Sequence, residues 1–196
     1  MTLEITVGDA DLIGRSVREP ELFTEIFDRY SSEILRYACA RLGGDLAEDV
    51  TAETFLAAFR QRSRFDLSAG SARPWLYGIA VRQISRYRRA EARRLRLLRS
   101  AASVGRPDEE DFGDRSAERV TAARLGPRLA AVLAGLPRQD RELLLLIAWA
   151  GLSYAEAAAA MELTESAIKA RLHRIRVRTR RELGGINPLG QEAGNG

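Results

Sequence analysis

The sequence predicts an all-α protein with two small helical domains joined by a flexible acidic linker. Apolar residues recur at intervals of three and four over most of residues 22–183, which is the spacing of amphipathic helices. Residues 101–120 break this pattern, because they combine glycine and proline with six acids and have no sustained apolar period. A chain of 196 residues has room for two compact cores of small-domain size.

The first domain opens with a long helix over residues 22–42, which the pair Gly43-Gly44 ends. Asp45 and Glu48 then form a capping-box-like start for a second helix. The packed sides of these two helices are predicted to carry Phe23, Ile26, Phe27, Tyr30, Ile34, Ala38 and Leu42 in the first, and Val50, Thr54, Ala57 and Ala58 in the second.

The first turns of the second helix are acidic and contain no basic residue. Asp45, Glu48, Asp49 and Glu53 all lie there. Acids near a helix N-terminus are stabilised by the helix dipole, and this explains them without any further role. A patch on which a partner docks is the other interpretation, and the residues alone do not choose between the two.

A third long helix follows a loop over residues 65–71, and Pro74 lies in its first turn, where proline is well tolerated. Residues 60–99 hold twelve arginines against only Asp66 and Glu91. Aromatic side chains beside arginines suit unpaired nucleic-acid strands, although a lone Trp75 is more often a core residue. The packed stripe carries Leu76, Ile79, Ala80, Gln83 and Tyr87, and the broadly opposite face carries Trp75, Gly78, Arg82, Ser85 and Arg89.

The second domain starts with a helix whose packed side carries Leu129, Val132, Leu133 and Leu136, and Pro137 interrupts it. Asp140 is predicted to cap an apolar helix over residues 141–150. These helices form the platform for the last two, which hold the most informative pattern in the chain.

Residues 151–183 encode two helices joined by a tight turn, and the second helix is densely basic. Ser153 and Glu156 fit a capping box, Thr164 caps the longer helix, and the turn between them is Glu162-Leu163. The pair Gly184-Gly185 is expected to end the last helix. This is the pattern of a helix-turn-helix, whose second helix enters the major groove of DNA.

The last helix divides into two faces. Ile168, Leu172 and Ile175 fall on one stripe and are predicted to pack against the preceding helices. The other face mixes cations, which bind phosphates and guanine edges, with small groups that let the helix approach the bases. It carries Lys169, Ala170, His173, Arg174, Val177 and Arg181.

Composition limits the classes of function. The net charge is +4 and the isoelectric point is near 9.7, but all basic residues except Lys169 are arginine, so composition is weaker evidence for nucleic acid than placement. Cys39 is the sole cysteine, which excludes an internal disulfide and favours a buried thiol. No leader peptide, spanning segment, catalytic motif or metal constellation is recognisable, so we expect a cytoplasmic, non-catalytic protein without cofactor or membrane insertion.

Three motifs resemble those of the extracytoplasmic-function (ECF) sigma factors, a compact two-domain class of the sigma-70 family. They are DLAEDVTAETFLAAFR at 45–60, RPWLYGIAVRQISRYRR at 73–89 and GLSYAEAAAAMELTESAIKARLHRIR at 151–176. The resemblance implies a variable segment at 1–20, sigma region 2 at 21–99, a linker at 100–126, sigma region 4 at 127–184 and a flexible tail at 185–196.

The resemblance also implies partners and roles. Glu48, Asp49 and Glu53 match the region 2 surface that docks on the β′ clamp of core RNA polymerase, and region 4 would meet the β flap. The residues implied at the minus-10 element, where non-template bases are captured, are Phe65, Arg73, Trp75, Arg82, Ser85, Arg86 and Arg89. Those implied at the minus-35 duplex are Lys169, Ala170, Arg171, His173 and Arg174. An anti-sigma factor is a further partner that the family resemblance implies.

The chain departs from the family pattern at three positions. Arg82 stands where asparagine is usual, Ala167 where threonine is common and Ser166 where glycine is common. Two other classes of function stay open at this point. One is a dimeric helix-turn-helix regulator, in which residues 22–98 dimerise or sense a ligand, and the other is a protein-binding adaptor.

Overall fold

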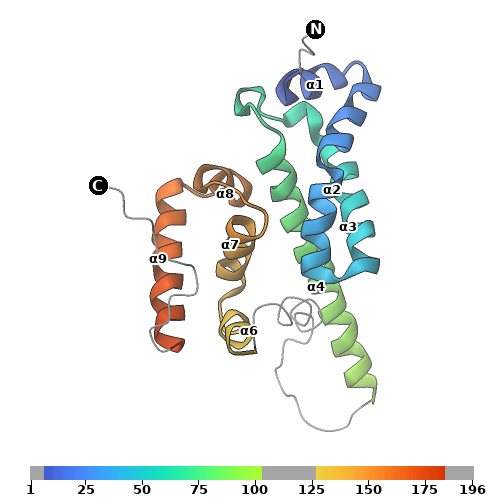
Figure 1. The fold of residues 1–196 in the computed structure, drawn as a ribbon. Coiled ribbons are helices and arrows are strands. Elements are labelled where there is room, and N and C mark those ends of the chain that lie inside the picture. The colour runs from blue at the N-terminus through green and yellow to red at the C-terminus, as the bar shows by residue number, and fades with distance from the viewer. Residues whose placement is uncertain (1–6, 103–126, 184–196) are drawn as a thin grey trace, which may run out of the picture.

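A computed structural model describes residues 7–102 and 127–183, and every regular element in these two ranges is a helix (Figure 1). The all-α prediction is therefore confirmed. The helices form an N-terminal bundle and a C-terminal helix-turn-helix domain. Their bounds are α1 Asp9–Ser16, α2 Phe23–Leu42, α3 Gly44–Gln61, α4 Arg73–Ala102, α6 Pro127–Ala134, α7 Arg138–Ala148, α8 Tyr154–Met161 and α9 Glu165–Glu182, with short 3-10 turns η1 Pro20–Leu22, η2 Arg62–Arg64 and η3 Leu67–Ala69.

The N-terminal bundle packs α2, α3 and the first half of α4 side by side, and α1 closes one end (Figure 1). The predicted apolar stripes largely form its core, since Ile26, Ile34, Val50, Leu76 and Ile79 are all buried. The break between α2 and α3 lies at Gly43, whose φ of 85° is a backbone conformation that favours glycine.

One buried carboxylate joins α1 to the bundle. Asp9 Oδ1 accepts a hydrogen bond from Arg29 at 2.9 Å, and Asp9 Oδ2 accepts from the Tyr30 hydroxyl at 2.5 Å and from the Ala72 N–H at 2.8 Å. The side chain therefore ties α1 to α2 and to the start of α4. Local sequence patterns could not reveal the link to α4, because Ala72 lies 63 residues after Asp9.

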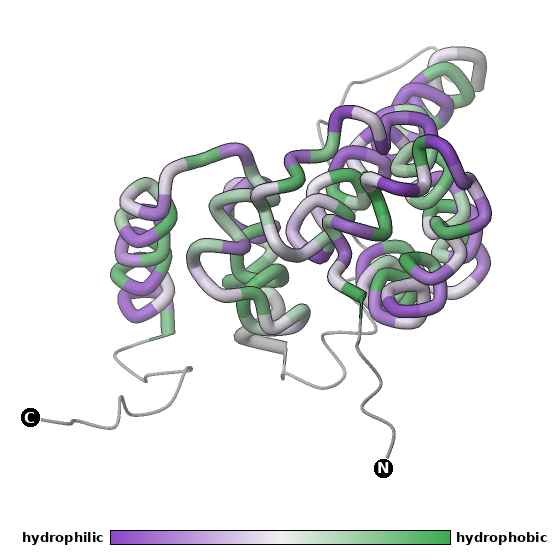
Figure 2. Tube along the Cα trace, turned by 90° about the horizontal axis from the view of Figure 1, so that it is seen from above, coloured by the Kyte–Doolittle hydropathy of each residue, from purple (hydrophilic) through white to green (hydrophobic). Residues whose placement is uncertain are grey.

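In the C-terminal domain, α7 and α6 lie below α8 and alongside α9 (Figure 1). Seen from above, α9 lies at one side of the molecule, and hydrophilic and hydrophobic positions alternate along its turns (Figure 2). Ile168, Leu172 and Ile175 are buried as predicted. Residues 103–126 of the predicted linker at 100–126, the predicted Gly184-Gly185 stop and the tail lie outside the described residues, and residues 100–102 belong to α4.

The predicted helix starts had mixed outcomes. Ser153 and Glu156 form both hydrogen bonds of the capping box, and the Thr164 hydroxyl accepts from the Ala167 N–H at 3.2 Å. The Asp45 cap is wrong, because α3 already begins at Gly44 and no side chain caps it. The Asp140 cap is also wrong: α7 begins at Arg138, and the Asp140 side chain instead lies 3.6 Å from Arg171.

The two domains pack against each other. Helix α8 lies against α4, and α7 reaches α2 through polar contacts (Figure 1). Gly78 is buried on the α4 face opposite the predicted packed stripe, because α8 packs against this part of the face. Cys39 is half-buried rather than buried, because it lines a groove between α2 and the end of α7.

Candidate nucleic-acid interface

Helix α9 presents one continuous exposed face. Lys169, Ala170, His173 and Arg174 are all exposed on the side opposite the buried stripe, as are Val177 and Arg181. Lys169 lies 2.7 Å from Glu165, one turn earlier, and the hydrogen bond with this carboxylate raises the pKa of Lys169. Lys169 is therefore a charged group near the N-terminal end of α9.

Arg171 lies elsewhere. Its guanidinium donates to Gln139 at 3.0 Å and lies 3.6 Å from Asp140, both on α7, and the side chain is half-buried. The structure thus separates Arg171 from the four other residues predicted at the minus-35 duplex. Its contacts brace α9 against its platform.

The turn before α9 is shaped by Glu162, the one described residue other than glycine with a left-handed backbone, at φ 56°. The N–H groups of Glu162 and Leu163 return to carbonyls of α8, which closes that helix. The turn leaves the Glu162 carboxylate pointing out of the domain, 77% exposed.

Two predicted aromatic residues lie together where the loop meets α4: Phe65 is in the loop and Trp75 is in the first turn of the helix. The rings of Phe65 and Trp75 are tilted at 58°, with centroids 4.9 Å apart. Phe65 is buried and Trp75 is half-buried. Asp66 caps the intervening turn by accepting from Ser68, so the loop is held at its base while Leu67 stays 56% exposed.

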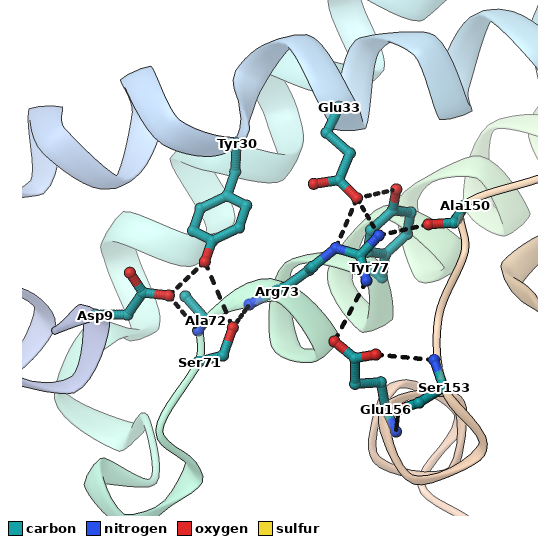
Figure 3. A network of polar contacts seen from close by, with 10 residues as sticks. All are labelled: Asp9, Tyr30, Glu33, Ser71, Ala72, Arg73, Tyr77, Ala150, Ser153 and Glu156. Carbon is teal, nitrogen blue, oxygen red and sulfur yellow. Dashed lines mark hydrogen bonds and ion pairs between the residues drawn. The ribbon is translucent and has the colours of Figure 1, made fainter.

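Arg73, at the first position of α4, lies at the centre of a polar network (Figure 3). Its Nε donates to Glu33 at 2.7 Å, and its Nη1 donates to Glu156 at 3.3 Å. The Ala150 carbonyl accepts from the same guanidinium. Burial would lower the pKa of Arg73, but the hydrogen bonds and the charge of Glu33 outweigh burial and raise it. The arginine is a permanent cation shared between both domains.

The remaining predicted minus-10 residues lie further along α4. Arg82 is half-exposed and ion-paired with Glu162 of the helix-turn-helix turn at 2.7 Å. Arg86 is exposed and donates to Gln83 at 3.3 Å, and Arg89 is exposed. A cleft of about 350 Å³ separates this part of α4 from the second domain, and Arg82, Ser85 and Arg89 line it.

The comparisons with known proteins agree with this arrangement. The model of sigma-70 region 2 matches residues 26–94, and the model of sigma-70 region 4 matches residues 127–178. The ECF RNA polymerase sigma factor SigL of Mycobacterium tuberculosis is 31% identical over 166 residues, which cover 84% of this chain and 90% of that protein. The chain belongs to the ECF sigma factors.

Other relatives place the two regions in the same family. The ECF sigma factor SigC of Mycobacterium tuberculosis is 36% identical over 66% of each chain. The structure of CnrH in complex with the cytosolic domain of CnrY aligns with a TM-score of 0.62 at 24% identity, and covers 90% of this chain and 97% of that one. This likeness confirms the fold. The protein is thus a sigma subunit of RNA polymerase, a DNA-binding protein that acts in transcription initiation.

Region 2 of this sigma factor also carries the acidic surface. Glu48, Asp49 and Glu53 are exposed on α3, and Leu56, 46% exposed, continues the same helix. Of the acids predicted here, none takes part in an ion pair within the described ranges. The surface is therefore open in the isolated chain.

Sequence reasoning missed the residues that join region 2 to region 4. Glu142 on α7, with Tyr37 and Arg41 on α2, is buried between the regions. One signal was available, because Glu142 directly precedes the apolar run of residues 143–150 and a buried carboxylate needs a partner. The sequence could not identify that partner.

Two absences complete the site. No described helix has the length and apolar character needed to cross a membrane. Across residues 7–102 and 127–183, no three His, Cys, Asp or Glu side chains cluster as they would around a metal ion.

Proposed function

We propose that this sigma factor directs core RNA polymerase to promoters with two separate elements, and that it assists strand opening at one of them. The observation that carries the proposal is the presence of two distinct cationic surfaces, on α9 and α4, in different domains of one chain. Two different readers on one polypeptide suit an asymmetric two-part site.

Region 4 is proposed to bind the minus-35 duplex through α9. The exposed face is formed by Lys169, Ala170, His173 and Arg174, and the buried Ile168 and Leu172 fix its orientation. An arginine or lysine bidentate to guanine supplies about 1–3 kcal/mol of discrimination. Ala170 leaves room for the helix to approach the base edges. Arg171 contributes by holding α9 on α7, which revises its predicted role as a direct contact.

Region 2 is proposed to capture the non-template strand of the minus-10 element. Base stacking on an aromatic ring contributes about 1–3 kcal/mol, and Trp75 supplies a half-buried ring next to Phe65. Arg82, Arg86 and Arg89 follow at spacings that place them along one side of α4, where guanidiniums suit the phosphate backbone. Arg82 contributes a charge where relatives usually have asparagine, so a different base preference is expected here.

The acidic surface of α3 is proposed to dock on the β′ clamp of core polymerase, and region 4 on the β flap. Glu48, Asp49 and Glu53 are exposed and carry no partner from this chain within the described residues. The chemistry of RNA synthesis belongs to the polymerase. Known sigma factors are non-catalytic subunits, and the same is proposed here.

An anti-sigma factor is proposed as a further partner. Two structural neighbours are a complex of CnrH with the cytosolic domain of CnrY and a complex of the sigma factor RpoE with the anti-sigma factor NepR from Bartonella quintana. The second aligns with a TM-score of 0.56 at 21% identity. A free dimeric regulator is not favoured, since region 2 and region 4 models both match.

Transcription with sigma-free core polymerase tests the proposal. Promoter fragments selected by the reconstituted holoenzyme are treated with permanganate, which modifies unpaired thymines. We expect reactive thymines near the minus-10 element only when both core and this chain are present. Tight binding of the free chain to palindromic duplexes, with no effect of core, would instead establish the regulator.

A further inference from the structure

Helix α1 packs against the loop over residues 65–71 as well as against the bundle. It lies in the segment at 1–20, which the family resemblance describes as variable. The middle of the loop, residues 66–70, is exposed, whereas Phe65 before it and Ala72 after it are buried. The loop is therefore an exposed tip between two fixed ends, and the contacts at those ends decide how the tip is presented.

Asp9 of α1 holds the end of the loop that leads into α4. Its Oδ2 accepts from the Ala72 N–H at 2.8 Å and from the Tyr30 hydroxyl at 2.5 Å (Figure 3). The Tyr30 hydroxyl also lies 3.4 Å from the Ser71 Oγ. Burial and the hydrogen bond to Asp9 raise the pKa of Tyr30, so its hydroxyl stays protonated and remains a donor. The Asp9 carboxylate also lies at the N-terminal end of α4, where the helix dipole favours a negative charge.

Two further contacts with α1 hold the start and the middle of the loop. Arg62, in the turn η2 before the loop, donates from Nε to the Ser16 carbonyl at 3.1 Å. The Arg62 carbonyl in turn accepts from the Phe65 N–H at 3.1 Å. Gly14 lies against Leu67, because a Cβ on Gly14 would lie 3.3 Å from Leu67 Cδ2. Contacts with α1 thus extend from the start of the loop to its end.

Base selectivity and total affinity have different requirements in a protein that binds single strands. Phosphate contacts carry no sequence information, and they tolerate small movements because charges act over about 8–10 Å at ordinary salt. Selection of a base requires groups that are held within about 0.5 Å of one geometry. The exposed Arg86 and Arg89 lie on α4, outside the loop, so α1 does not position them.

We infer that α1 is a positioning element for the loop over residues 65–71, and that Asp9 and Gly14 determine how strictly the minus-10 base is selected. The inference rests on the proposed capture of the non-template strand by region 2. Asp9 is buried and acts through the Ala72 N–H, and Gly14 acts through Leu67. Loss of either contact therefore broadens the base preference and changes the total affinity little.

Two substitutions disturb the loop through different contacts. Asp9→Ala removes the acceptor of the Ala72 N–H. Gly14→Leu fills the space that Leu67 occupies, while α1 keeps its stability because leucine is a better helix former than glycine.

Each substitution has a matched control. Val50→Ala lowers the stability of the same bundle by opening a cavity, and Val50 lies in the half of α3 away from the loop. Gly44→Leu places the same new side chain in another helix, where a Cβ meets nothing within 4 Å. The controls thus separate loss of stability and added bulk from movement of the loop.

The experiment measures the base preference of holoenzyme reconstituted from sigma-free core polymerase and the full chain. Each variant is mixed with a pool of promoter fragments that derive from those the parent holoenzyme selects. In this pool the non-template bases of the minus-10 element are unpaired and randomised. Sequencing of the bound and unbound fragments gives the preference at each position. A second pool, randomised at the minus-35 element, reports on region 4.

Asp9→Ala and Gly14→Leu should each lower the ratio of the preferred base to the next by about fivefold or more at one or two adjacent minus-10 positions. Total binding to the pool should fall by less than about threefold, because the phosphate contacts remain. Val50→Ala and Gly44→Leu should retain the parent ratios. The minus-35 preferences should be unchanged in all four variants.

The outcomes separate this role of α1 from strand capture itself. Unchanged minus-10 preferences in Asp9→Ala and Gly14→Leu, or an equal loss in Val50→Ala, would overturn the role of α1 and leave strand capture standing. A parent holoenzyme with no minus-10 preference at all would reject strand capture, and this role with it. Should Asp9→Ala fail to fold by circular dichroism, the comparison of Gly14→Leu with Gly44→Leu decides the result.

Discussion

Arg73 on α4 and Glu156 on α8 lie 3.3 Å apart, and the same glutamate closes the capping box of its own helix. Its Oε2 accepts from the Ser153 N–H at 2.8 Å, while its Oε1 faces the arginine. One carboxylate therefore serves both the start of the helix-turn-helix and the contact between regions. The two roles can be separated by mutation.

Ser153→Ala should destabilise region 4 without touching the contact between regions. The Glu156 N–H loses its acceptor at 3.2 Å, and loss of an N-cap costs about 0.5–2 kcal/mol. Urea unfolding followed by circular dichroism measures the change. An unchanged midpoint would show that water replaces the cap at no cost.

Acid should weaken the contribution of Glu156. Burial alone would raise its pKa, but the hydrogen bonds from Ser153 and the charge of Arg73 outweigh burial and lower it below the ordinary 4.5. Because the folded pKa is depressed, the stabilisation is complete above the unfolded pKa and is lost as pH falls through the folded value. Unfolding curves between about pH 6 and 3 should therefore converge for the parent and Glu156→Gln. A constant gap over this range contradicts the assignment.

Two arginines three residues apart on α9 should behave differently. Arg174→Ala removes an outward cation, and we expect minus-35 duplex binding by the holoenzyme to fall by about 10- to 100-fold with unchanged stability. Arg171→Ala removes a partner of Asp140 and should instead lower stability by at most about 1 kcal/mol, with a smaller effect on DNA. Fluorescence anisotropy and urea unfolding distinguish the two, and reversed results would return Arg171 to the DNA face.

Charge reversal on α3 should weaken polymerase binding. Asp49→Lys and Glu53→Lys change exposed side chains and should leave folding intact, while the affinity for core falls by about tenfold or more. Asp28→Lys on α2 is the matched control, since Asp28 is an exposed acid of region 2 outside the acidic surface. Equal losses for all three would point to net charge rather than to a docking site.

Asp9→Asn tests the anchor of α1. The asparagine keeps one acceptor oxygen but replaces the other with an NH2 donor. In one orientation of the amide this donor faces the Tyr30 hydroxyl and the Ala72 N–H, and in the other it faces the Arg29 guanidinium, so at least one donor loses its acceptor. An unsatisfied buried group costs about 1–3 kcal/mol, so the free energy of unfolding should fall by that amount. Hydrogen exchange at Ala72 should rise at the same time, and unchanged exchange would place the cost elsewhere.

The sequence predicted those features that depend on neighbouring residues. The stripe of Ile168 and Leu172, the Thr164 cap and the Gly43 break all follow from local spacing and local hydrogen bonds. The errors at Asp45 and Asp140 arose because these acids resemble caps locally, whereas a helix could start earlier at Gly44 and after Pro137.

Contacts between the regions could not be predicted in this way. The partner of Glu142 lies about a hundred residues earlier in the chain, and neither Tyr37 nor Arg41 stands out from its own helix. Gly78 fell on the face opposite the core stripe, which periodicity treats as free. Only packing shows that α8 occupies this face.

The sharing of Arg73 among Glu33, Glu156 and the Ala150 carbonyl has a thermodynamic consequence. A guanidinium held by three acceptors is not available to a phosphate, so the proposed strand capture would compete with the contact between the regions for the same cation. The apparent dissociation constant of the free chain then equals the intrinsic constant divided by the fraction of molecules in which Arg73 is released. A ligand that binds region 4 more tightly when Arg73 is released would raise that fraction, and would thereby tighten the proposed strand binding at a site it never touches.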